Sequence, residues 1–299
     1  MEVLVTGASG FVGQHLVRAM RNSGFKVRAA GRRPINIVGV NWSLLDDVNS
    51  TDWKNVCLGA DIIVHLAGIA HTRHVSSSEF KKVNQEAPIA LASALDPTQH
   101  LIFVSSIRAA VGVSSASEIL ENTEPLPSCS YGYTKLEAER GIQRILPNSC
   151  LMRPVSIYGS GARANIRHLE IFARSGLPLP VKSFLGTRSF LSVENLCSAI
   201  MFAAEKRLSG ICNVSDPDTA CLSDIVVWYR EALGLRANIF SMPESARSIL
   251  SLWPRMKPIL SLASEPLVAR PLRLLDKLWC PPHQSTREGV SLWAMRNTR

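Results

Sequence analysis

The sequence predicts an α/β protein with a doubly wound parallel sheet and a smaller, interleaved C-terminal lid. Short apolar segments alternate with longer amphipathic ones, and a glycine-rich turn follows the first apolar segment. The short segments are apolar throughout, as expected of central strands that are covered by helices on both faces. The chain has 299 residues, 46% of them hydrophobic and 19% charged, which excludes a disordered, collagen-like or coiled-coil protein.

Strands and helices are expected to alternate as far as residue 233. The strands are expected at residues 3–6, 27–30, 61–67, 101–105, 150–155 and 211–214, and the helices at 12–22, 77–95, 132–145, 193–206 and 223–233. Residues 156–191 are rich in Gly and Pro, and the chain after residue 237 is basic and interrupted by Pro. We therefore predict one domain over residues 1–155 and the lid over 156–299, with residues 193–216 returning to the main sheet.

The formal net charge of +9 fits a phosphorylated ligand, a nucleic acid or a membrane surface. Residues 236–299 hold ten Lys or Arg against four Asp or Glu, and these basic residues are scattered. The chain has no run of alternating aromatic and basic residues, so no nucleic-acid partner is expected. A solvated basic surface and a weak peripheral membrane contact through the basic C-terminal region both stay open.

The seven cysteines form no C-x-x-C pair, so neither a disulfide framework nor a metal site is expected. Met1 leads directly into a strand, and no uninterrupted apolar run reaches about 18 residues. The sequence therefore predicts a soluble protein of the reducing cytoplasm.

Three glycines mark the turn between the first strand and the first helix, in the pattern Gly7-x-x-Gly10-x-x-Gly13. Glycine lets the backbone turn tightly and approach a pyrophosphate, and the helix N-terminus then offers free N–H groups and a positive dipole end. The turn predicts a Rossmann-type dinucleotide site. Its expected residues are Gly7, Ser9, Gly10, Phe11, Val12 and Gly13.

The end of the second strand indicates which dinucleotide binds. An acidic residue at this position would hold the 2′-hydroxyl of a ribose, but the chain has Arg32 and Arg33 here and no Asp or Glu between Lys26 and Leu45. Two guanidinium groups suit a 2′-phosphate, which favours NADP(H) over NAD(H). The alternative is a pair of solvated arginines.

A tyrosine and a lysine at helical spacing are candidate catalytic residues. Tyr131 and Lys135 are separated by four residues and share a helix face. A nearby ammonium group is expected to lower the pKa of the phenol towards neutral pH, whereas the i+4 neighbour of Tyr133 is Glu137, which would raise it. Ser105 and Ser106 end a buried strand, where a serine hydroxyl could bind a substrate oxygen.

Together these motifs resemble the extended short-chain dehydrogenase/reductases, in their nucleotide-sugar epimerase/dehydratase branch. The resemblance extends over nearly the whole chain. It includes Val64-His65-Leu66-Ala67-Gly68, Asn84, Arg153-Pro154, Tyr158-Gly159, Asn165, Arg188 and Leu278-Trp279-Cys280-Pro281-Pro282. Short segments of the chain also resemble one subgroup of this family, which occurs in bacterial surface-polysaccharide gene sets. Some members of that subgroup reduce UDP-4-keto-6-deoxy-N-acetylhexosamines.

The resemblance implies a catalytic set of Ser106, Tyr131 and Lys135, where Ser106 is chosen over Ser105 by its spacing from the family motif. The segment 107–112 departs from the family by an apparent extra residue. Further cofactor contacts are implied for Leu66, Ala67, Gly68, Lys135 and Pro154. Substrate contacts are implied for Asn84, Ser106, Tyr131, Tyr158, Asn165 and Arg188.

The implied activity is NADPH-dependent reduction of the C4 ketone of a UDP-4-keto-6-deoxy-N-acetylhexosamine for surface polysaccharide such as O-antigen. The alternatives are a UDP-hexose or UDP-N-acetylhexosamine 4-epimerase and a non-catalytic NADP-binding protein. The resemblance also implies a homodimer, for which the helices at 77–95 and 132–145 are the candidate contacts.

Overall fold

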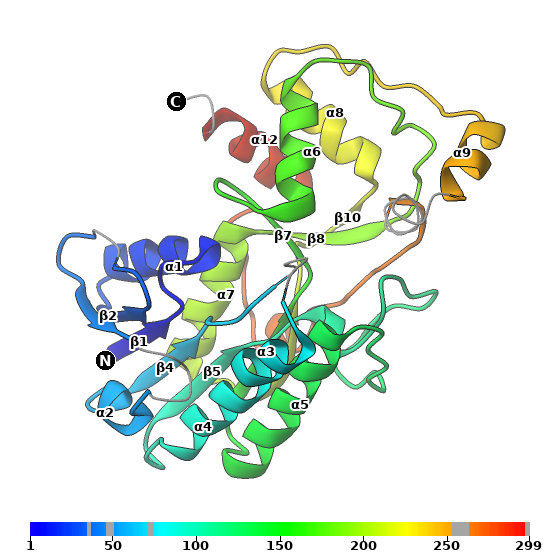
Figure 1. Cartoon of the computed structure of the whole chain (residues 1–299). Coiled ribbons are helices and arrows are strands. Elements are labelled where there is room, and N and C mark those ends of the chain that lie inside the picture. Colours follow the sequence, from blue (N-terminus) through cyan, green and yellow to red (C-terminus); the bar gives the residue numbers. More distant parts are fainter. Residues whose placement is uncertain (35–36, 46–50, 71–74, 253–262, 297–299) are drawn as a thin grey trace.

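A seven-stranded parallel sheet forms the main body of the protein (Figure 1). The computed structural model describes residues 1–34, 37–45, 51–70, 75–252 and 263–296. The strand order is β3-β2-β1-β4-β5-β6-β9, with every pair parallel. The strands are β1 (Glu2–Thr6), β2 (Lys26–Gly31), β3 (Asn41–Leu44), β4 (Ile62–His65), β5 (His100–Val104), β6 (Cys150–Pro154) and β9 (Gly210–Val214). The predicted fold class is confirmed.

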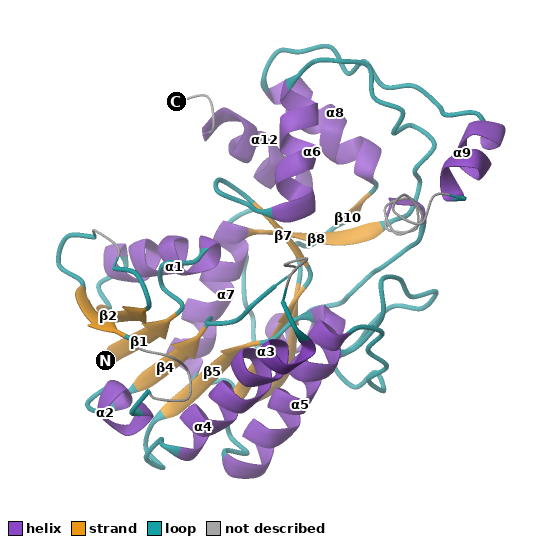
Figure 2. Ribbon diagram, in the orientation of Figure 1, coloured by secondary structure: helices purple, strands orange, loops and turns teal. Residues whose placement is uncertain are grey.

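Helices cover both faces of this sheet, as Figure 2 shows. One face carries α1 (Phe11–Asn22) and α7 (Val193–Lys206), and the other carries α2 (Trp53–Cys57), α4 (Ala87–Ser93) and α5 (Ser130–Ile145). Strand β1 shows why: Val3 and Val5 belong to the core beneath α1, while Leu4 belongs to the core beneath α4 and α5. Successive strand side chains point to opposite faces, so a strand buried on both faces must be apolar throughout.

The predicted helix over 77–95 consists of three consecutive pieces: α3 (Ser77–Lys81), the π-helical turn η1 (Lys82–Glu86) and α4. In the main body, the prediction missed β3 and α2; it also named no helix or strand in residues 156–192 or after residue 233. Strand β3 is four residues long and contains no fully buried residue, and α2 has only five residues. Neither segment is long enough to give a clear hydrophobic period.

The lid is a second layer above the carboxyl ends of the main strands (Figure 1). Its small sheet has the order β10-β8-β7, from β7 (Ser156–Tyr158), β8 (Arg188–Ser192) and β10 (Thr219–Ala220). The helices of the lid are α6 (Ala164–Arg174), α8 (Leu222–Ala232), α9 (Glu244–Ser251) and α12 (Thr286–Arg296), whereas the short helix α11 (Leu272–Asp276) packs against β9 of the main sheet. Tyr158, Tyr229 and Trp293 form the centre of the lid core.

The chain passes between the two layers more than once. After β7 and β8 of the lid, α7 packs against α1 and β9 pairs with β6 in the main sheet, from Cys150 opposite Gly210 to Pro154 opposite Val214. The chain then returns to the lid through β10. The division of the chain at residue 155 into two domains stays a prediction.

Within the described ranges, no helix has both the length and the apolar character needed to cross a lipid bilayer. The same part of the chain holds no group of three or more His, Cys, Asp or Glu that could bind a metal ion. Residues 253–262 of the basic C-terminal region lie outside the described residues.

Candidate active site

The glycine turn after β1 needs glycine for packing at two positions. Gly7 has φ +70°, and a Cβ on it would lie 2.6 Å from the backbone nitrogen of Ala67. A Cβ on Gly13 would lie 2.4 Å from the carbonyl oxygen of Gly7. Any larger residue would push α1 away from the ends of β1 and β4. These two strands flank the point where the strand order reverses, which is where open α/β sheets bind ligands.

The turn has the donor set that a pyrophosphate requires. Helix α1 has 12 residues, its N-cap is Gly10, and no acidic residue lies in its first turn. No described side chain caps this turn, so its first N–H groups point to the space beyond the sheet edge. Ser9, Phe11 and Val12 are half-buried around the same turn. The residues present therefore fit a dinucleotide.

Arg32 and Arg33 directly follow β2 and are exposed. The strand end that precedes them contacts the glycine turn, because the backbone N–H of Ala8 donates to the carbonyl of Ala30. The two arginines therefore leave the sheet next to the predicted dinucleotide site, where their charges fit a phosphate on the adenosine ribose.

Ser106 and Tyr131 meet although 25 positions separate them in the chain. A Cβ on Gly132 would lie only 2.2 Å from the carbonyl oxygen of Arg108, so glycine lets the start of α5 pack against the short turn η2 (Ile107–Ala109). This packing brings the hydroxyl of Ser106 into a hydrogen bond with the hydroxyl of Tyr131. Ser105, in contrast, is buried, and its Oγ has no hydrogen-bond partner among the described residues.

The pKa of Tyr131 is raised above its ordinary value, mainly because the phenol is buried. The hydrogen bond from Ser106 and the positive charge of Arg108 lower this pKa but do not outweigh burial. The sequence led us to expect Lys135 to lower it, and this expectation is not met. Tyr131 is consequently a neutral phenol at neutral pH, which suits a proton donor.

Lys135 is almost completely buried, and its Nζ donates to the carbonyl oxygen of Val104 at 3.0 Å. The same Nζ lies 4.6 Å from the ring centroid of Phe103. Burial lowers the pKa of Lys135 to about 8, while the carboxylate of Glu139 acts in the opposite direction. Glu139 is itself held by Arg153, with 2.6 Å between Oε2 and Nη2. The ammonium therefore has a fixed position and a proton that it holds less tightly than an ordinary lysine.

The loop after β4 lies against Lys135. A Cβ on Gly68 would come 3.4 Å from Nζ of Lys135 and 3.1 Å from Oδ1 of Asn84. Leu66 and Ala67 precede it and are half-buried next to Gly7. Glycine at position 68 leaves no side chain between this loop and the side chains of Lys135 and Asn84.

Asn84, whose predicted substrate contact stays a prediction, binds the loop after β4. Its side chain is fully buried, its Oδ1 accepts from the N–H of Ile69 at 2.8 Å, and its Nδ2 donates to the carbonyl of Ile69 at 2.9 Å. Both ends of the amide thus bind the loop after β4. Asn84 therefore holds this loop in position.

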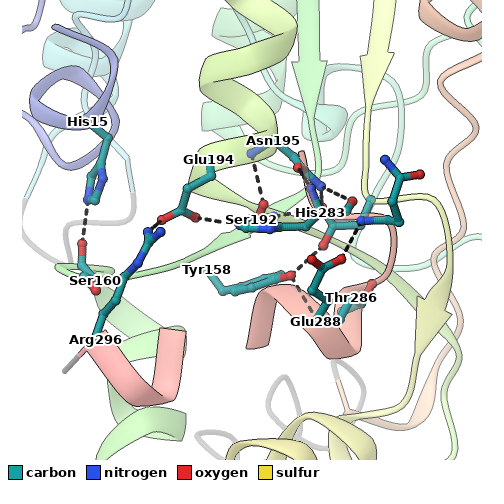
Figure 3. Close-up of polar contacts among 12 residues, drawn as sticks. His15, Tyr158, Ser160, Ser192, Glu194, Asn195, His283, Thr286, Glu288 and Arg296 are labelled. Carbon is teal, nitrogen blue, oxygen red and sulfur yellow. Dashed lines mark hydrogen bonds and ion pairs between the residues drawn. The ribbon is translucent and has the colours of Figure 1, made fainter. Parts of the chain in front are cut away.

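Tyr158 is also directed away from any open site. It is 1% exposed, and its hydroxyl donates to Oδ2 of Asp216 at 2.7 Å and to the carbonyl of Thr286 at 3.3 Å (Figure 3). Oδ1 of Asp216 accepts from the N–H of Ser192 and from Nδ2 of Asn195. Burial raises the pKa of Asp216 to about 6. Tyr158 thus belongs to a buried network that joins β7, β8, α7 and α12, and its predicted substrate contact stays a prediction.

The remaining predicted residues lie at different depths. Arg188 is 6% exposed and donates to the carbonyls of Glu265 at 2.7 Å and Val113 at 2.8 Å, so it ties β8 to two loops. Burial and the charge of Arg108 lower the pKa of Arg188 to about 10.

Asn165 is exposed near the start of α6, and Pro154 is buried in β6. The structure does not bring Asn165 and Arg188 together through any recorded contact.

Sequence reasoning missed Arg108. It is half-buried, its Nη2 lies 3.7 Å from Sγ of Cys129, and its Nε is buried without a hydrogen-bond partner among the described residues. Its charge acts on both Tyr131 and Arg188. The signal was present in the chain, because Arg108 is the one charged residue in the sequence from Leu101 to Ser117.

Known proteins resemble this chain in sequence and in fold. The model of the "NAD dependent epimerase/dehydratase family" matches residues 3–215. A UDP-glucose 4-epimerase of Vibrio cholerae is 29% identical over 240 residues, which cover 75% of this chain and 73% of the relative. A ceramide reductase of Caulobacter vibrioides is 27% identical over 305 residues, covering 96% and 88%. The solved structure of MoeE5 with UDP-glucose and NAD is 23% identical, with a TM-score of 0.77 over the whole of both chains.

Proposed function

The chain belongs to the NAD dependent epimerase/dehydratase family, and on that basis we propose that it reduces a ketone with NADPH. The proposed substrate is a UDP-4-keto-6-deoxy-N-acetylhexosamine, reduced at C4. One observation carries this proposal: a neutral, half-buried Tyr131 is hydrogen-bonded to Ser106 at the carboxyl edge of the sheet. A reduction needs a proton donor at this place, and the raised pKa of Tyr131 keeps the proton on the phenol.

Each residue of the site has a proposed role. Tyr131 donates its proton to the oxygen of the former ketone, and Ser106 donates a hydrogen bond to the same oxygen as negative charge develops on it. Lys135 holds a proton close to this pair and would bind the ribose of the nicotinamide. Asn84 fixes the loop after β4, and Gly68 keeps that loop in contact with Lys135.

NADP(H) is the proposed cofactor, and the glycine turn with Arg32 and Arg33 would hold it. When bound, it would supply a hydride to the ketone carbon. Leu66, Ala67 and Pro154 lie at the ends of β4 and β6 and would contact its nicotinamide half. The preference for the phosphorylated cofactor rests on the two exposed arginines and on the lack of an acidic residue after β2.

The nucleotide part of the substrate would bind beneath the lid. A guanidinium has five N–H donors, and the two carbonyl bonds of Arg188 use two of them. The remaining donors of Arg188 and the side-chain amide of Asn165 are the proposed ligands of the UDP pyrophosphate. Tyr158 would support this pocket from beneath, through its bonds to Asp216 and Thr286.

The direct test is incubation of the purified enzyme with NADPH and a UDP-4-keto-6-deoxy-N-acetylhexosamine. Cofactor absorbance should fall in proportion to the sugar reduced. The epimerase alternative is supported by the Vibrio cholerae relative. If UDP-N-acetylglucosamine or UDP-glucose is converted to its C4 epimer with no net change in cofactor absorbance, the chain is an epimerase instead.

A ketone on a lipid is a second candidate substrate, because the Caulobacter ceramide reductase covers nearly the whole chain. In addition, two of the five donors of Arg188 already bind backbone carbonyls and its side chain is 6% exposed, which leaves less of it for a pyrophosphate. The keto form of a ceramide, presented in detergent micelles, is the matching assay. NADPH consumption with this lipid and none with the keto sugar would replace the nucleotide-sugar assignment.

We also propose a cytoplasmic homodimer that forms through the faces of α4 and α5. Tyr133 and Ile145 on α5 are 54% and 40% exposed, which leaves apolar surface for a second copy. Light scattering coupled to gel filtration should give twice the mass of one chain, and Tyr133→Glu should reduce it. A monomer at all concentrations would remove this part of the proposal.

A further inference from the structure

An apolar and basic surface lies at the outer end of the lid. It consists of the second half of α6 and the segments 175–184 and 235–242, and we call it the lid tip. Exposed side chains here are Ile171, Phe172, Leu177 and Phe240, which are 49%, 55%, 63% and 47% exposed. In Figure 1, the segments 175–184 and 235–242 lie beyond the end of α6 that is farther from the main sheet. Large apolar side chains gathered on one exposed surface usually mark an interaction site.

Arg230 holds this surface in a fixed shape. Its guanidinium is fully buried and donates to five backbone carbonyls: those of Phe172, Ala173, Leu177, Ala237 and Asn238. Three backbone bonds also join the outer segments: the N–H of Leu179 donates to the carbonyl of Asn238, the N–H of Phe240 to that of Leu179, and the N–H of Lys182 to that of Phe240. The exposed apolar residues therefore sit on neighbouring segments with a defined backbone. An apolar surface with a fixed backbone cannot fold back into the protein. Its contact with water is therefore unfavourable until a partner covers it.

The charge of the lid tip indicates what covers it. The segments 163–185 and 235–242 contain Arg163, Arg167, Arg174, Lys182 and Arg236, all exposed, and one acidic residue. That residue, Glu170, is 1% exposed and lies 2.9 Å from Arg167 and 3.8 Å from Arg174. A second copy of the chain would bring like charges together at this surface. An anionic lipid surface complements both the basic groups and the apolar side chains.

We propose that the lid tip binds the surface of an anionic membrane. Phe172, Leu177 and Phe240 enter the interface between headgroups and acyl chains, and the surrounding arginines and Lys182 contact the anionic headgroups. This surface differs from the membrane contact that the sequence predicted, because α6 and residues 175–184 lie outside the basic C-terminal region; only residues 236–242 belong to both. The proposal does not depend on the reaction, since none of these residues lies in the candidate active site.

Vesicle flotation tests the proposal on the intact enzyme. Wild type should float with vesicles of phosphatidylcholine and phosphatidylglycerol, bind poorly to phosphatidylcholine alone, and dissociate at high salt. Phe172→Ser together with Phe240→Ser should lower the partition coefficient by about tenfold or more, because each phenyl ring loses its burial. Lys182→Glu together with Arg236→Glu should abolish the preference for phosphatidylglycerol.

Matched controls change the same residue types elsewhere. Leu58→Ser with Leu126→Ser removes apolar groups that are 64% and 77% exposed, and Lys54→Glu with Lys206→Glu reverses two exposed charges. These variants should float as wild type does. All variants should keep the thermal midpoint and the turnover of a water-soluble substrate, which separates this proposal from the proposed function.

Three outcomes would overturn the proposal. Wild type could fail to float with anionic vesicles, or it could bind both kinds of vesicle equally. The lid-tip variants could also float as well as their controls. If the phenylalanine double variant instead turned a dimer into a monomer on gel filtration, the lid tip would be a contact between two copies of the chain.

Discussion

The Nζ of Lys135 donates a 3.0 Å hydrogen bond to the backbone carbonyl of Val104. This bond ties the first turns of α5 to the last residue of β5, two residues before Ser106. The lysine is thereby fixed near the serine and tyrosine of the candidate site, and its burial lowers its pKa to about 8. The positions of Tyr131 and Ser106 depend on the same contact between helix and strand.

Replacing Tyr131 with Phe should abolish most of the turnover and leave dinucleotide binding nearly unchanged. The hydroxyl transfers the proton, whereas the ring packs as before, so the rate should fall by roughly 10²–10⁴. Tyr133→Phe is the matched control, since that side chain is 54% exposed. Steady-state kinetics and cofactor titration measure both effects. A crippling effect of Tyr133→Phe with a mild effect of Tyr131→Phe would refute the assignment.

Replacing Arg32 with Ala and Arg33 with Ser should weaken NADPH binding much more than NADH binding. The loss of charge-assisted bonds to a phosphate should cost about 1.5–3 kcal/mol. Fluorescence titration of both cofactors measures the ratio of affinities. Arg18→Ala, an exposed arginine on α1, should leave this ratio unchanged. A wild-type preference for NADH would contradict the prediction.

Replacing Arg108 with Gln should raise the pKa of Tyr131, because the guanidinium charge now lowers it. The alkaline limb of the profile of reduction rate against pH should therefore move to higher pH. The same change removes the positive charge that lowers the pKa of Arg188. Arg108→Lys keeps the charge and should restore most of the wild-type profile. An unchanged profile for Arg108→Gln would show that the charge does not reach Tyr131.

Lys135 should make the free energy of unfolding depend on pH. The pKa of Lys135 is about 8 in the folded protein and 10.5 ordinarily. At a pH between these two values, the unfolded chain therefore binds more protons than the folded protein. Stability should consequently rise with pH across this window, by on the order of 3 kcal/mol from this residue. Lys135→Met should remove that rise while filling the same space. Denaturant unfolding at both ends of the window measures the difference, and equal slopes for the two proteins would contradict it.

Replacing Asp216 with Ala should destabilise the lid strongly. The hydroxyl of Tyr158, the N–H of Ser192 and the Nδ2 of Asn195 would lose their buried acceptor. Unsatisfied buried donors cost about 1–3 kcal/mol each, so the melting temperature should fall by about 10 °C. Glu244→Ala, at an exposed position, is the control. A melting temperature within about 2 °C of wild type would mean that the network contributes little.

Site residues could be found from the sequence when their partners lie close to them along the chain. Tyr131 and Lys135 share one helix, and Gly7, Gly10 and Gly13 share one turn, so local spacing was sufficient to find them. The lowered pKa expected for Tyr131 was wrong because burial raises it. Burial is a property of the assembled molecule, and no local pattern reports it.

Three residues with predicted substrate contacts have partners inside the protein that the sequence did not indicate. Tyr158 bonds to Asp216 and Thr286, which lie 58 and 128 positions away, and Arg188 bonds to carbonyls 77 and 75 positions away. Asn84 turns towards Ile69, 15 positions earlier. The sequence showed that these polar residues exist, but only the fold decides whether a buried polar group satisfies itself within the protein or remains available to a ligand.

The sequence by itself determined the alternation of strands and helices, the glycine turn and the basic pair after β2, because each depends on neighbours along the chain. Tertiary structure decided that Ser106 meets Tyr131, that Arg108 adds its charge to the site, and that Arg230 assembles the lid tip from three separate segments. These contacts join parts of the chain that only packing brings together. Their strength depends on desolvation, which only the folded interior provides.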